Sequence, residues 1–467
     1  MHELFLQQLK EITGDSFVFD AEDIKAGYAR DHSLHQACPF DVLVKPATAR
    51  QIAAIFCLCN QYKVPVTPRG GGTGVTGGAL PVAGGVVLSL ERLNRIIEID
   101  VPNRYAILET GVVTQVFCEA LEAAGMYFPV APGSKGSSFI GGNIAENAAG
   151  ARSCKYGTFK DQVLNLEVVL PTGEIIYTGA NVYKNATGFN LTHLFTGSEG
   201  MLGIITRAVL KIIPRPSKTS VLLVGFKELE QACQAVLQLA GNTIKPSCIE
   251  MITREAIDIT LPFLPAGYPM LGKETNALLL LEWEEYAEPV MVQAIDNACA
   301  ILEGFDVVDI YSADTTPEIA FIWRLREIIG EAMTHNGHVY RDIDACVPPA
   351  RLYDYLKAVN QAAKEYDRTV ISFGHAMDGN LHTMLLLTAD QAYDAANTKE
   401  LLTAIFTAAV EMGGVISGEH GIGCLQQDFL PLQMSTKQLS ILQQIKNVFD
   451  PNGILNPGKL LSQGLNN

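Results

Sequence analysis

Two histidines and a carboxylate lie close together in the segment 373–382, whose sequence is Phe-Gly-His-Ala-Met-Asp-Gly-Asn-Leu-His. Asp378-Gly379 is a strong signal for a hairpin turn between two strand-like runs. A two-residue turn there places His375 directly opposite His382, with the two Cβ atoms about 4.5–5.5 Å apart. Two imidazoles at that spacing can bind one divalent cation. The alternative is a pair of hydrogen-bonded histidines at the surface.

A second polar pair lies between glycines in the segment 413–423, Gly-Gly-Val-Ile-Ser-Gly-Glu-His-Gly-Ile-Gly. In an extended backbone, neighbouring side chains point in opposite directions. We therefore expect Glu419 to complete a cation site with the two histidines, while His420 faces a neighbouring pocket as a base. On its own, a Glu-His pair between glycines is a weak pattern.

The segment 68–78 is a glycine loop that contains the pattern GxGxxG at residues 72–77. That pattern binds a dinucleotide in a Rossmann fold only where it ends a strand and begins a helix. Here a strand-like run at 86–90 follows, so a Rossmann site is disfavoured. Six glycines in nine residues instead leave the backbone amides open to a diphosphate, which Thr73 and Thr76 can also bind. The alternative is a flexible linker.

Two further segments of small residues accompany this loop. The segment 132–150 contains Asn143 and Asn147, whose amides can hydrogen-bond a flat heteroaromatic ring. The segment 196–203 leads into a strand-like run from Ile204. Together the three segments indicate one large ligand with a phosphate part and a ring part, although each of the last two alone is equally consistent with a tight turn.

Arginines are the candidate ligands for an anionic substrate. Arg324 and Arg326 lie about 200° apart around a helix, because each residue turns it by about 100°. They cannot both face one pocket, so at most one of them is expected to be functional. Arg341 is a third cation in an otherwise acidic region.

The elements that must position these residues form two groups along the chain. In the first, Thr48 and Gln51 have the form of a capping box and begin a helical pattern that runs to about Tyr62. Strand-like runs follow at 64–67, 86–90, 106–110, 166–170, 175–177 and 204–213. Their irregular alternation with helices indicates an α+β domain rather than a doubly wound sheet.

The pattern of expected helices and strands changes at Pro214-Arg-Pro216, where two prolines indicate a boundary between domains. Helical patterns then occur at 229–239, 289–302, 316–335, 350–366 and 391–411. They alternate with strand-like runs at 220–226, 277–283, 370–374 and 381–387. This pattern predicts a second, α/β domain, followed by a helix at 439–449.

The composition is that of a folded chain of two to four domains, with 467 residues, 48% hydrophobic and 18% charged. The 34 basic and 50 acidic residues give a net charge of −16, which argues against nucleic-acid binding. Residues 1–215 carry 18 basic and 19 acidic side chains, which leaves 16 basic and 31 acidic ones in 216–467, a net charge of −15.

Ten scattered cysteines without a CxxC pair, and an N-terminus too charged for a signal peptide, favour a reduced, cytoplasmic protein. No apolar run approaches the ~20 residues of a spanning helix, so no membrane insertion is expected.

Six motifs in combination resemble the vanillyl-alcohol-oxidase-type flavoproteins, in the branch of the D-lactate, glycolate and D-2-hydroxyglutarate dehydrogenases. They are PRGGGTGVTGG, GGNIAENAAG, GSEGMLGIIT, GHAMDGNLH, SGEHGIG and DPNGILNPGK, and the resemblance extends from about residue 38 to residue 462. The resemblance implies an α+β fold, with a two-subdomain FAD-binding domain plus an α/β cap domain. The expected boundaries are an N-terminal helical segment 1–37, the FAD domain 38–215, the cap 216–430 and a C-terminal segment 431–467 that returns to the FAD domain.

The resemblance also assigns roles by position. His375, His382 and Glu419 would bind one divalent metal ion (Zn, Fe or Mn), His420 would be the base, and Arg326 would bind the substrate carboxylate with help from Arg341. The residues that would bind FAD are Pro68, Arg69, Gly70, Gly71, Gly72, Thr73, Gly74, Thr76, Gly77, Gly78, Pro132, Gly133, Ser134, Ser138, Gly141, Gly142, Asn143, Asn147, Gly150, Gly203, Ile205 and Asn456.

Two departures from the family refine the expectation. Thr73 stands where members with covalent FAD often have His or Cys, so FAD is expected to bind non-covalently. Members that act on D-2-hydroxyglutarate tend to have Asn where this chain has Met384, and Met cannot bind a second carboxylate. The resemblance thus favours a short 2-hydroxy acid, D-lactate first, and an electron-transferring flavoprotein or a quinone-linked partner as acceptor. The alternatives are the catalytic subunit of a glycolate oxidase, a D-2-hydroxyglutarate dehydrogenase and, least favoured, a non-catalytic flavin-binding subunit.

Overall fold

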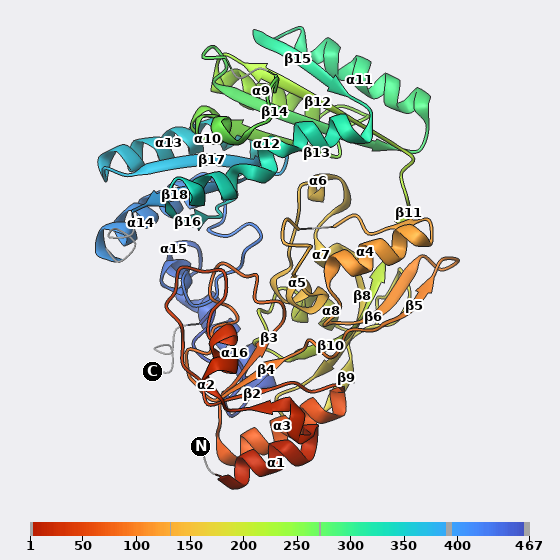
Figure 1. The fold of residues 1–467 in the computed structure, drawn as a ribbon, viewed down its shortest axis with the longest axis vertical. Coiled ribbons are helices and arrows are strands. Elements are labelled where there is room, and N and C mark those ends of the chain that lie inside the picture. Colours follow the sequence, from red (N-terminus) through yellow and green to blue (C-terminus); the bar gives the residue numbers. More distant parts are fainter. Residues whose placement is uncertain (1–2, 131, 270–271, 389–394, 462–467) are drawn as a thin grey trace. The chain divides into compact units, whose positions relative to one another are not determined.

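The computed structural model describes residues 3–130, 132–269, 272–388 and 395–461. The chain divides into two compact units, whose elements are labelled in Figure 1. The first unit comprises Met1–Gly150, Gly157–Arg215 and Glu419–Asn467, and the second comprises Ala151–Tyr156 and Pro216–Gly418. The chain enters the second unit at the expected proline joint and leaves it at Gly418, before the expected boundary at residue 430. Residues 1–37 belong to the first unit.

The first unit contains a small sheet with the strand order β1-β2-β4-β3. Its strands are β1 (Val18–Phe19), β2 (Val42–Val44), β3 (Val66–Arg69) and β4 (Val86–Ser89). β4 pairs in parallel with both β2 and β3. The glycine loop connects β3 to β4 without a helix, which confirms that it is not a Rossmann loop.

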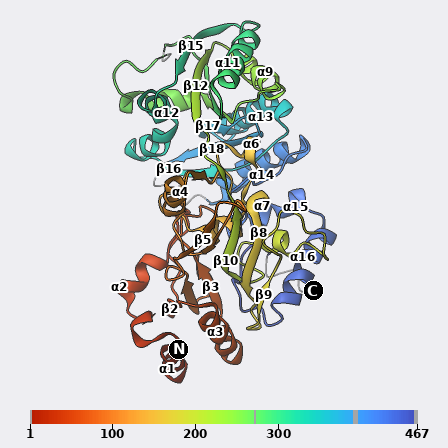
Figure 2. The same cartoon turned by 90° about the vertical axis from the view of Figure 1, so that its right-hand side faces the viewer.

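Helix α3 (Ala49–Tyr62) covers this sheet and ends where the sequence predicts. Its first turn is capped by Thr48, whose Oγ1 accepts a hydrogen bond from the Gln51 N–H. Ile52, Ile55 and Phe56 pack into the core beneath it. Helix α1 (Glu3–Thr13) lies along α3, and α2 is a short helix at Glu22–Lys25 (Figure 2).

A second sheet of the first unit has the strand order β5-β6-β10-β8-β9, with antiparallel neighbours. The strands are β5 (Ile96–Asp100), β6 (Tyr105–Glu109), β8 (Val163–Val169), β9 (Ile175–Tyr177) and β10 (Ile204–Lys211). A two-stranded ribbon pairs β7 (Met126–Tyr127) with β11 (Ile213–Pro214). The helices are α4 (Thr114–Ala123), α5 (Ile140–Glu146), α7 (Phe159–Gln162) and α8 (Leu191–Phe195). The sequence did not predict α5, because its two glycines and its small residues resemble a loop.

The C-terminal part of the first unit contains α15 (Leu430–Gln433) and α16 (Thr436–Phe449). After α16 the chain returns to β3. The Val66 N–H donates to the Ile454 carbonyl at 2.8 Å, and the Asn456 N–H donates to the Val66 carbonyl at 2.7 Å. Asn456 therefore lies next to the strand that leads into the glycine loop.

The second unit is built on one seven-stranded antiparallel sheet with the order β15-β12-β14-β13-β17-β18-β16. The strands are β12 (Lys218–Phe226), β13 (Cys248–Thr253), β14 (Ala277–Glu285), β15 (Val307–Ala313), β16 (Val339–Ile343), β17 (Thr369–His375) and β18 (Asn380–Leu387). The helices are α6 (Ser153–Tyr156), α9 (Leu229–Ala240), α10 (Arg254–Thr260), α11 (Glu288–Leu302), α12 (Thr316–His335), α13 (Leu352–Glu365) and α14 (Ala395–Glu411). The first residues of the predicted helix 391–411 lie outside the described part of the chain.

One face of this sheet carries an apolar core under α10 and α12 (Figure 1). Ile252, Phe373 and Met384 belong to that core, as do Leu325 and Ile329 of α12. The same face continues into polar residues, which form the candidate site. In the described residues, no helix is both long and apolar enough to cross a membrane.

Candidate active site

The hairpin of β17 and β18 carries the two histidines, but its register differs from the predicted one. His375 pairs with Asn380, and Phe373 pairs with His382, so the expected pairing of His375 with His382 is wrong by two residues. A two-residue type I′ turn needs positive φ at both central residues. Gly379 has a φ of 80°, whereas Asp378 is not among the residues with positive φ. A four-residue loop, 376–379, therefore connects the strands.

The two histidines nevertheless share one face of the sheet, because a shift of two residues preserves the face. Their ring centroids lie 5.3 Å apart, with an angle of 79° between the ring planes. Both side chains are buried, with 7% exposure for His375 and 5% for His382.

Glu250 holds His375. The register of β13 and β17 places Glu250 directly opposite His375, and the Glu250 Oε1 forms a short hydrogen bond with the His375 Nδ1. The other oxygen of Glu250 accepts a hydrogen bond from the Arg326 Nε at 2.6 Å. Burial raises the pKa of Glu250, but the electrostatic interactions and hydrogen bonds with His375 and Arg326 outweigh it and lower the pKa to about 2. Glu250 is therefore an ionised carboxylate inside the sheet.

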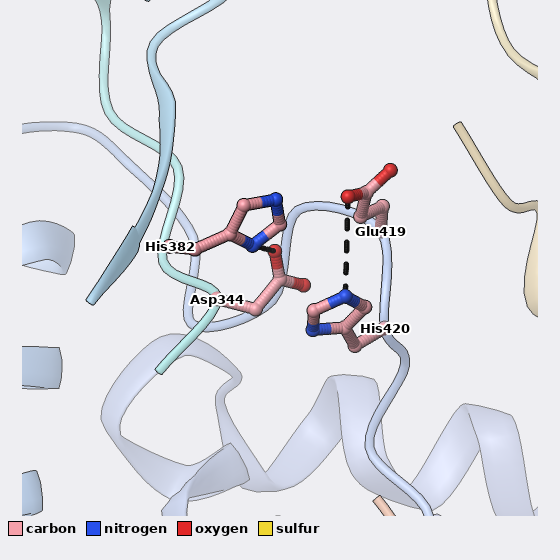
Figure 3. A group of neighbouring side chains, drawn as sticks. All are labelled: Asp344, His382, Glu419 and His420. Atoms are coloured by element: carbon pink, nitrogen blue, oxygen red, sulfur yellow. Dashed lines mark ion pairs between the residues drawn. The ribbon is translucent and has the colours of Figure 1, made fainter. Parts of the chain in front are cut away.

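His382 belongs to a group of four side chains with Asp344, Glu419 and His420 (Figure 3). Each offers one ligand atom, and these atoms all lie within 4.8 Å of one another. The His382 Nδ1 is 4.0 Å from an Asp344 oxygen, and the His420 Nε2 is 3.9 Å from a Glu419 oxygen. Glu419 and His420 directly follow Gly418, the last residue of the second unit.

The expectation that Glu419 and His420 point apart is wrong, because both contribute ligand atoms to this group. The backbone bends at residues 418–420 instead of continuing as a strand, so the alternation of strand side chains does not apply.

Asp344 is a member of the group that the sequence did not single out. It follows β16 and is fully buried. Its carboxylate accepts hydrogen bonds from the Asn380 Nδ2 and the Ser417 Oγ, both at 2.9 Å, and its carbonyl accepts the Gly418 N–H at 2.7 Å. Asp344 therefore fixes the chain just before Glu419. The signal in the sequence was the spacing Asp342-x-Asp344, because in an extended backbone two such side chains point the same way.

The candidate substrate arginines take different positions. Arg326 lies on the face of the two histidines, with its guanidinium carbon 4.6 Å from the centre of the Phe373 ring. Arg324 pairs instead with Glu331 at 3.6 Å. Arg341 lies opposite Leu385, and the next pair is Asp342 with Met384, which shares the face of His382. Because neighbouring side chains in a strand alternate between faces, the Arg341 side chain points to the other face of the sheet.

Burial lowers the pKa of Arg341 to about 10. Its expected assistance to substrate binding stays a prediction.

The predicted FAD residues all belong to the first unit. In the glycine loop, Arg69 is buried, and its guanidinium donates to the carbonyls of Gly27 and Tyr28 at 3.4 Å. Burial lowers the pKa of Arg69, and no carboxylate of the described residues lies within ion-pair distance of it. A buried cation beside open backbone amides suits an anionic diphosphate. The loop therefore fits the diphosphate of FAD.

The glycine loop also holds the His420 segment. The Thr76 Oγ1 donates to the His420 carbonyl at 3.1 Å, and the Thr76 carbonyl accepts the Cys424 N–H at 3.1 Å. The candidate base is thus attached to the loop that is predicted to bind the cofactor.

The asparagines predicted to bind a ring already have protein partners. The Asn143 amide donates to the Thr114 Oγ1 at 2.7 Å, and the Asn147 Oδ1 accepts the Lys160 N–H at 2.9 Å. The Asn456 amide donates to the Glu199 carbonyl at 2.9 Å. The Asn143 Nδ2 also donates to the Ser138 Oγ at 3.3 Å, so the Asn143 side chain would interact with a bound ring by accepting a hydrogen bond at its carbonyl oxygen.

The third loop and α5 bring two carboxyl groups together. Both oxygens of Glu199 accept backbone N–H groups, from Ile422 at 2.9 Å and Gly423 at 2.7 Å. Burial raises the pKa of Glu146 well above its usual value, and the charges of Glu199 and Asp31 add to this rise. The buried Glu146 Oε2 has no hydrogen-bond partner among the described residues. The sequence pointed to neither residue, because a single carboxyl group has no spacing pattern.

The group of Asp344, His382, Glu419 and His420 fits a divalent metal ion. Two imidazoles and two carboxylates form the mixed nitrogen and oxygen donor set that suits zinc, iron or manganese. His375 lies beside the group, since its ring packs edge-on against His382.

Comparisons with known proteins agree with this architecture. Residues 40–179 match the family model "FAD binding domain", and residues 215–460 match "FAD linked oxidases, C-terminal domain". The chain is 34% identical to a glycolate oxidase subunit GlcD from Bacillus subtilis, with 98% of this chain and 96% of that protein covered. It is 36% identical to a D-lactate dehydrogenase from Archaeoglobus fulgidus, with 90% and 91% covered. It is 30% identical to a D-2-hydroxyglutarate dehydrogenase from Stutzerimonas stutzeri, with 98% of both covered.

Among solved structures, p-cresol methylhydroxylase has a TM-score of 0.81 at 18% identity, covering 99% of this chain and 97% of that one. A 4-ethylphenol oxidase from Gulosibacter chungangensis has a TM-score of 0.80 at 17% identity, covering 99% and 98%. At these identities the likeness concerns the fold alone, and it confirms the predicted α+β fold with an FAD domain and a second domain. The chain belongs to the FAD-linked oxidases with the vanillyl-alcohol-oxidase-type fold, as an oxidoreductase of the lactate, glycolate and 2-hydroxyglutarate dehydrogenase branch.

Proposed function

We propose that this protein oxidises a short D-2-hydroxy acid, D-lactate, to its 2-oxo acid, pyruvate. The observation that carries the proposal is the convergence of two imidazoles and two carboxylates in one group that includes His420. Such a group can hold a metal ion and a proton acceptor for an alcohol. The relatives support the substrate class, because they are named as D-lactate dehydrogenases and glycolate oxidase subunits.

Met384 supports a short substrate. It lies on the same face of the sheet as His382, two residues further along β18, and is packed in the apolar core with Ile371 and Phe373. A thioether in an apolar cluster offers no charge-assisted hydrogen bond to a second carboxylate. A dicarboxylate such as D-2-hydroxyglutarate would lack a partner at this position.

In the proposed mechanism, bound FAD would supply the acceptor for the hydride of the α-carbon, and a bound metal ion would supply a Lewis acid for the hydroxyl. His420 takes the hydroxyl proton at a ring nitrogen. His382, Glu419 and Asp344 would hold the metal ion together with His375, and His420 would then serve as the base rather than as a ligand. Arg326 binds the substrate carboxylate through its terminal amino groups, because its Nε already donates to Glu250.

Two related activities are the alternatives. The Bacillus subtilis relative is named as a glycolate oxidase subunit, and the Stutzerimonas stutzeri relative is named as a D-2-hydroxyglutarate dehydrogenase. A non-catalytic flavin-binding subunit is disfavoured, because it would not need the imidazoles and carboxylates of the group.

We propose an electron-transferring flavoprotein as the acceptor, ahead of a quinone-linked partner. The ten cysteines contain no CxxC pair or other pattern for an iron–sulfur cluster, so the sequence indicates no second redox centre in the chain. The electrons must then leave to a separate acceptor. The acidic second half of the chain offers a surface for a basic partner.

A steady-state assay with D-lactate tests the metal, the base and the acceptor in turn. We expect chelation to abolish turnover and a divalent ion to restore it, and we expect His420→Ala to lower kcat by about 100-fold or more while FAD stays bound. Electron-transferring flavoprotein should be reduced faster than quinone. Turnover that survives chelation shows that no metal ion is needed for the reaction. Wild-type turnover in His420→Ala shows that His420 is not the base. Ready reduction of quinone without reduction of the flavoprotein overturns the acceptor.

A further inference from the structure

Glu250 is a buried carboxylate that holds two side chains of the proposed site at once. Its oxygens meet the His375 ring on β17 and the Arg326 guanidinium on α12. We propose that Glu250 is a positioning residue. It fixes which nitrogen His375 offers to a metal ion and how Arg326 meets an anionic substrate, an inference that rests on the proposed function.

The register of the sheet makes the contact with His375 unavoidable. Glu250 and His375 are directly opposed on neighbouring antiparallel strands, and their neighbours Met251 and Gly374 are paired as well. Opposed side chains on one face have Cβ atoms about 4.5–5.5 Å apart. Glu250 is fully buried, so its carboxylate has the His375 ring and Arg326 as polar neighbours in place of water.

The chemistry of the pair sets the tautomer of His375. The Glu250 carboxylate is paired with the Arg326 guanidinium, and a carboxylate in such a pair only accepts hydrogen bonds. The His375 Nδ1 therefore carries the proton that it donates to Glu250. The lone pair of the neutral ring is then on Nε2. Carboxylates in this arrangement orient a metal-binding histidine and raise its basicity, and losing them typically weakens metal binding about 10- to 100-fold.

The same carboxylate orients Arg326. The Arg326 Nε donates to the Glu250 Oε2 at 2.6 Å, and the guanidinium lies over the Phe373 ring, with its carbon 4.6 Å from the ring centre. Glu250 therefore binds the Nε edge of the guanidinium, and the Phe373 ring covers one of its faces. Its terminal amino groups keep the donors that can form a bidentate pair with a substrate carboxylate.

The neighbouring strand provides a matched control. Glu282 of β14 is also buried, with 1% exposure, and it also accepts from two donors, the Arg152 Nε at 2.7 Å and the Trp323 Nε1 at 2.9 Å. Neither donor is a histidine of the proposed metal site. A change at Glu282 therefore removes a buried carboxylate without touching His375.

The test uses the FAD-loaded protein, stripped with a chelator and titrated with Zn²⁺. Glu250→Gln replaces the carboxylate by an amide of the same shape. If the amide NH₂ faces His375, the ring must move its proton to Nε2, and if the amide oxygen faces His375, the ring loses its charged partner. In both orientations we expect the Zn²⁺ dissociation constant to rise by about tenfold or more, while Glu282→Gln stays within about twofold of wild type.

A third variant separates the two roles of Glu250. Arg326→Gln leaves the bond between Glu250 and His375 in place, so Zn²⁺ affinity should stay within about twofold of wild type. The KM for D-lactate should rise by about tenfold or more, since a charge-assisted pair is lost. Equal Zn²⁺ affinity in wild type and Glu250→Gln overturns the inference, as does an equal loss in all three variants.

The structure of the Zn²⁺-loaded wild-type protein decides the matter if Glu250→Gln does not fold. Metal bound to the His375 Nε2, with Nδ1 still on Glu250, supports the inference, and metal on Nδ1 or absent from His375 overturns it. The Zn²⁺ titration needs no substrate, so it stands even if D-lactate is not oxidised. A wild-type protein that binds no Zn²⁺ overturns both the inference and the proposed metal.

Discussion

Single carboxyl groups determine much of the chemistry of this molecule, and Glu146 is one whose neighbouring charges are acidic. Its pKa is raised by burial, and by the charges of Glu199 and Asp31. The folded protein therefore holds a proton on Glu146 at pH values where the unfolded chain, with a pKa near 4.5, has released it. This proton makes the folded state less stable, relative to the unfolded one, as pH rises above 4.5.

Glu146→Gln should therefore stabilise the protein at pH 8, because an amide resembles the protonated acid and binds no proton. The gain should shrink as pH falls toward 4.5, by about 1.4 kcal/mol for each pH unit between the two pKa values. Thermal unfolding of the FAD-loaded protein from pH 5 to pH 8 measures it, and Glu119→Gln on the exposed side of α4 is the control. A gain that does not depend on pH would contradict the raised pKa.

At the residue scale, the sequence revealed the side chains that recur in motifs but not those that act alone. His382, Glu419 and His420 were predicted from their motifs, and the structure brings them together. Glu250 and Glu146 were missed, because each is a lone carboxyl group whose partners come from distant parts of the chain. Asp344 was missed although its spacing from Asp342 is that of two side chains on one face of an extended segment. Only the strand register and the loop contacts reveal such partners.

At the scale of the elements, the conformation of the glycine loop depends on the absence of side chains at its glycines. A Cβ atom on Gly71 would lie 2.3 Å from the Ser137 carbonyl oxygen, which belongs to the second segment of small residues. The two segments can approach each other only because residue 71 has no side chain.

Gly71→Ala should therefore push the two segments apart. We expect a loss of about 1–3 kcal/mol in the free energy of unfolding. The ratio of bound FAD to protein, measured by absorbance after gel filtration, should fall. Gly27→Ala is the control, because nothing lies within 4 Å of its Cβ position and the residue is exposed. Full FAD content and wild-type stability in Gly71→Ala would show that the loops do not need this close approach.

The longest helix of the second unit was predicted from its pattern, whereas two strands that carry residues of the site were not. The helix at 316–335 was predicted with the bounds that α12 has, because a long amphipathic pattern with Thr315 at its start is unambiguous. β13 and β16 were missed, since Glu250 and Asp342 interrupt their apolar runs. The same residues make these strands part of the site.

At the scale of the whole molecule, the two halves of the chain carry different net charges. The second half of the chain carries 16 basic and 31 acidic residues, yet the proposed substrate is an anion. Arg326 and a bound metal ion can resolve this conflict, because a cation at short range outweighs surface carboxylates that solvent and salt screen.

The division of the chain was only partly readable from its sequence. The joint at Pro214-Arg-Pro216 was visible as a proline pair, whereas the return at Gly418 and the short insertion Ala151–Tyr156 were not. No change in amino-acid composition marks either of these boundaries, and only the contacts of the folded chain define them.

The oxidation of D-lactate by the bound FAD tests the central claim most directly. The FAD-loaded protein is mixed anaerobically with D-lactate, L-lactate, glycolate or D-2-hydroxyglutarate, and the loss of the visible absorbance of FAD is followed in time. We predict that D-lactate bleaches the flavin at least about tenfold faster than D-2-hydroxyglutarate, since the apolar cluster around Met384 offers no partner for a second carboxylate. We also predict that D-lactate bleaches the flavin faster than L-lactate, because the proposed substrate is the D isomer. Faster bleaching by D-2-hydroxyglutarate, or no bleaching by any of the four acids, would contradict the account.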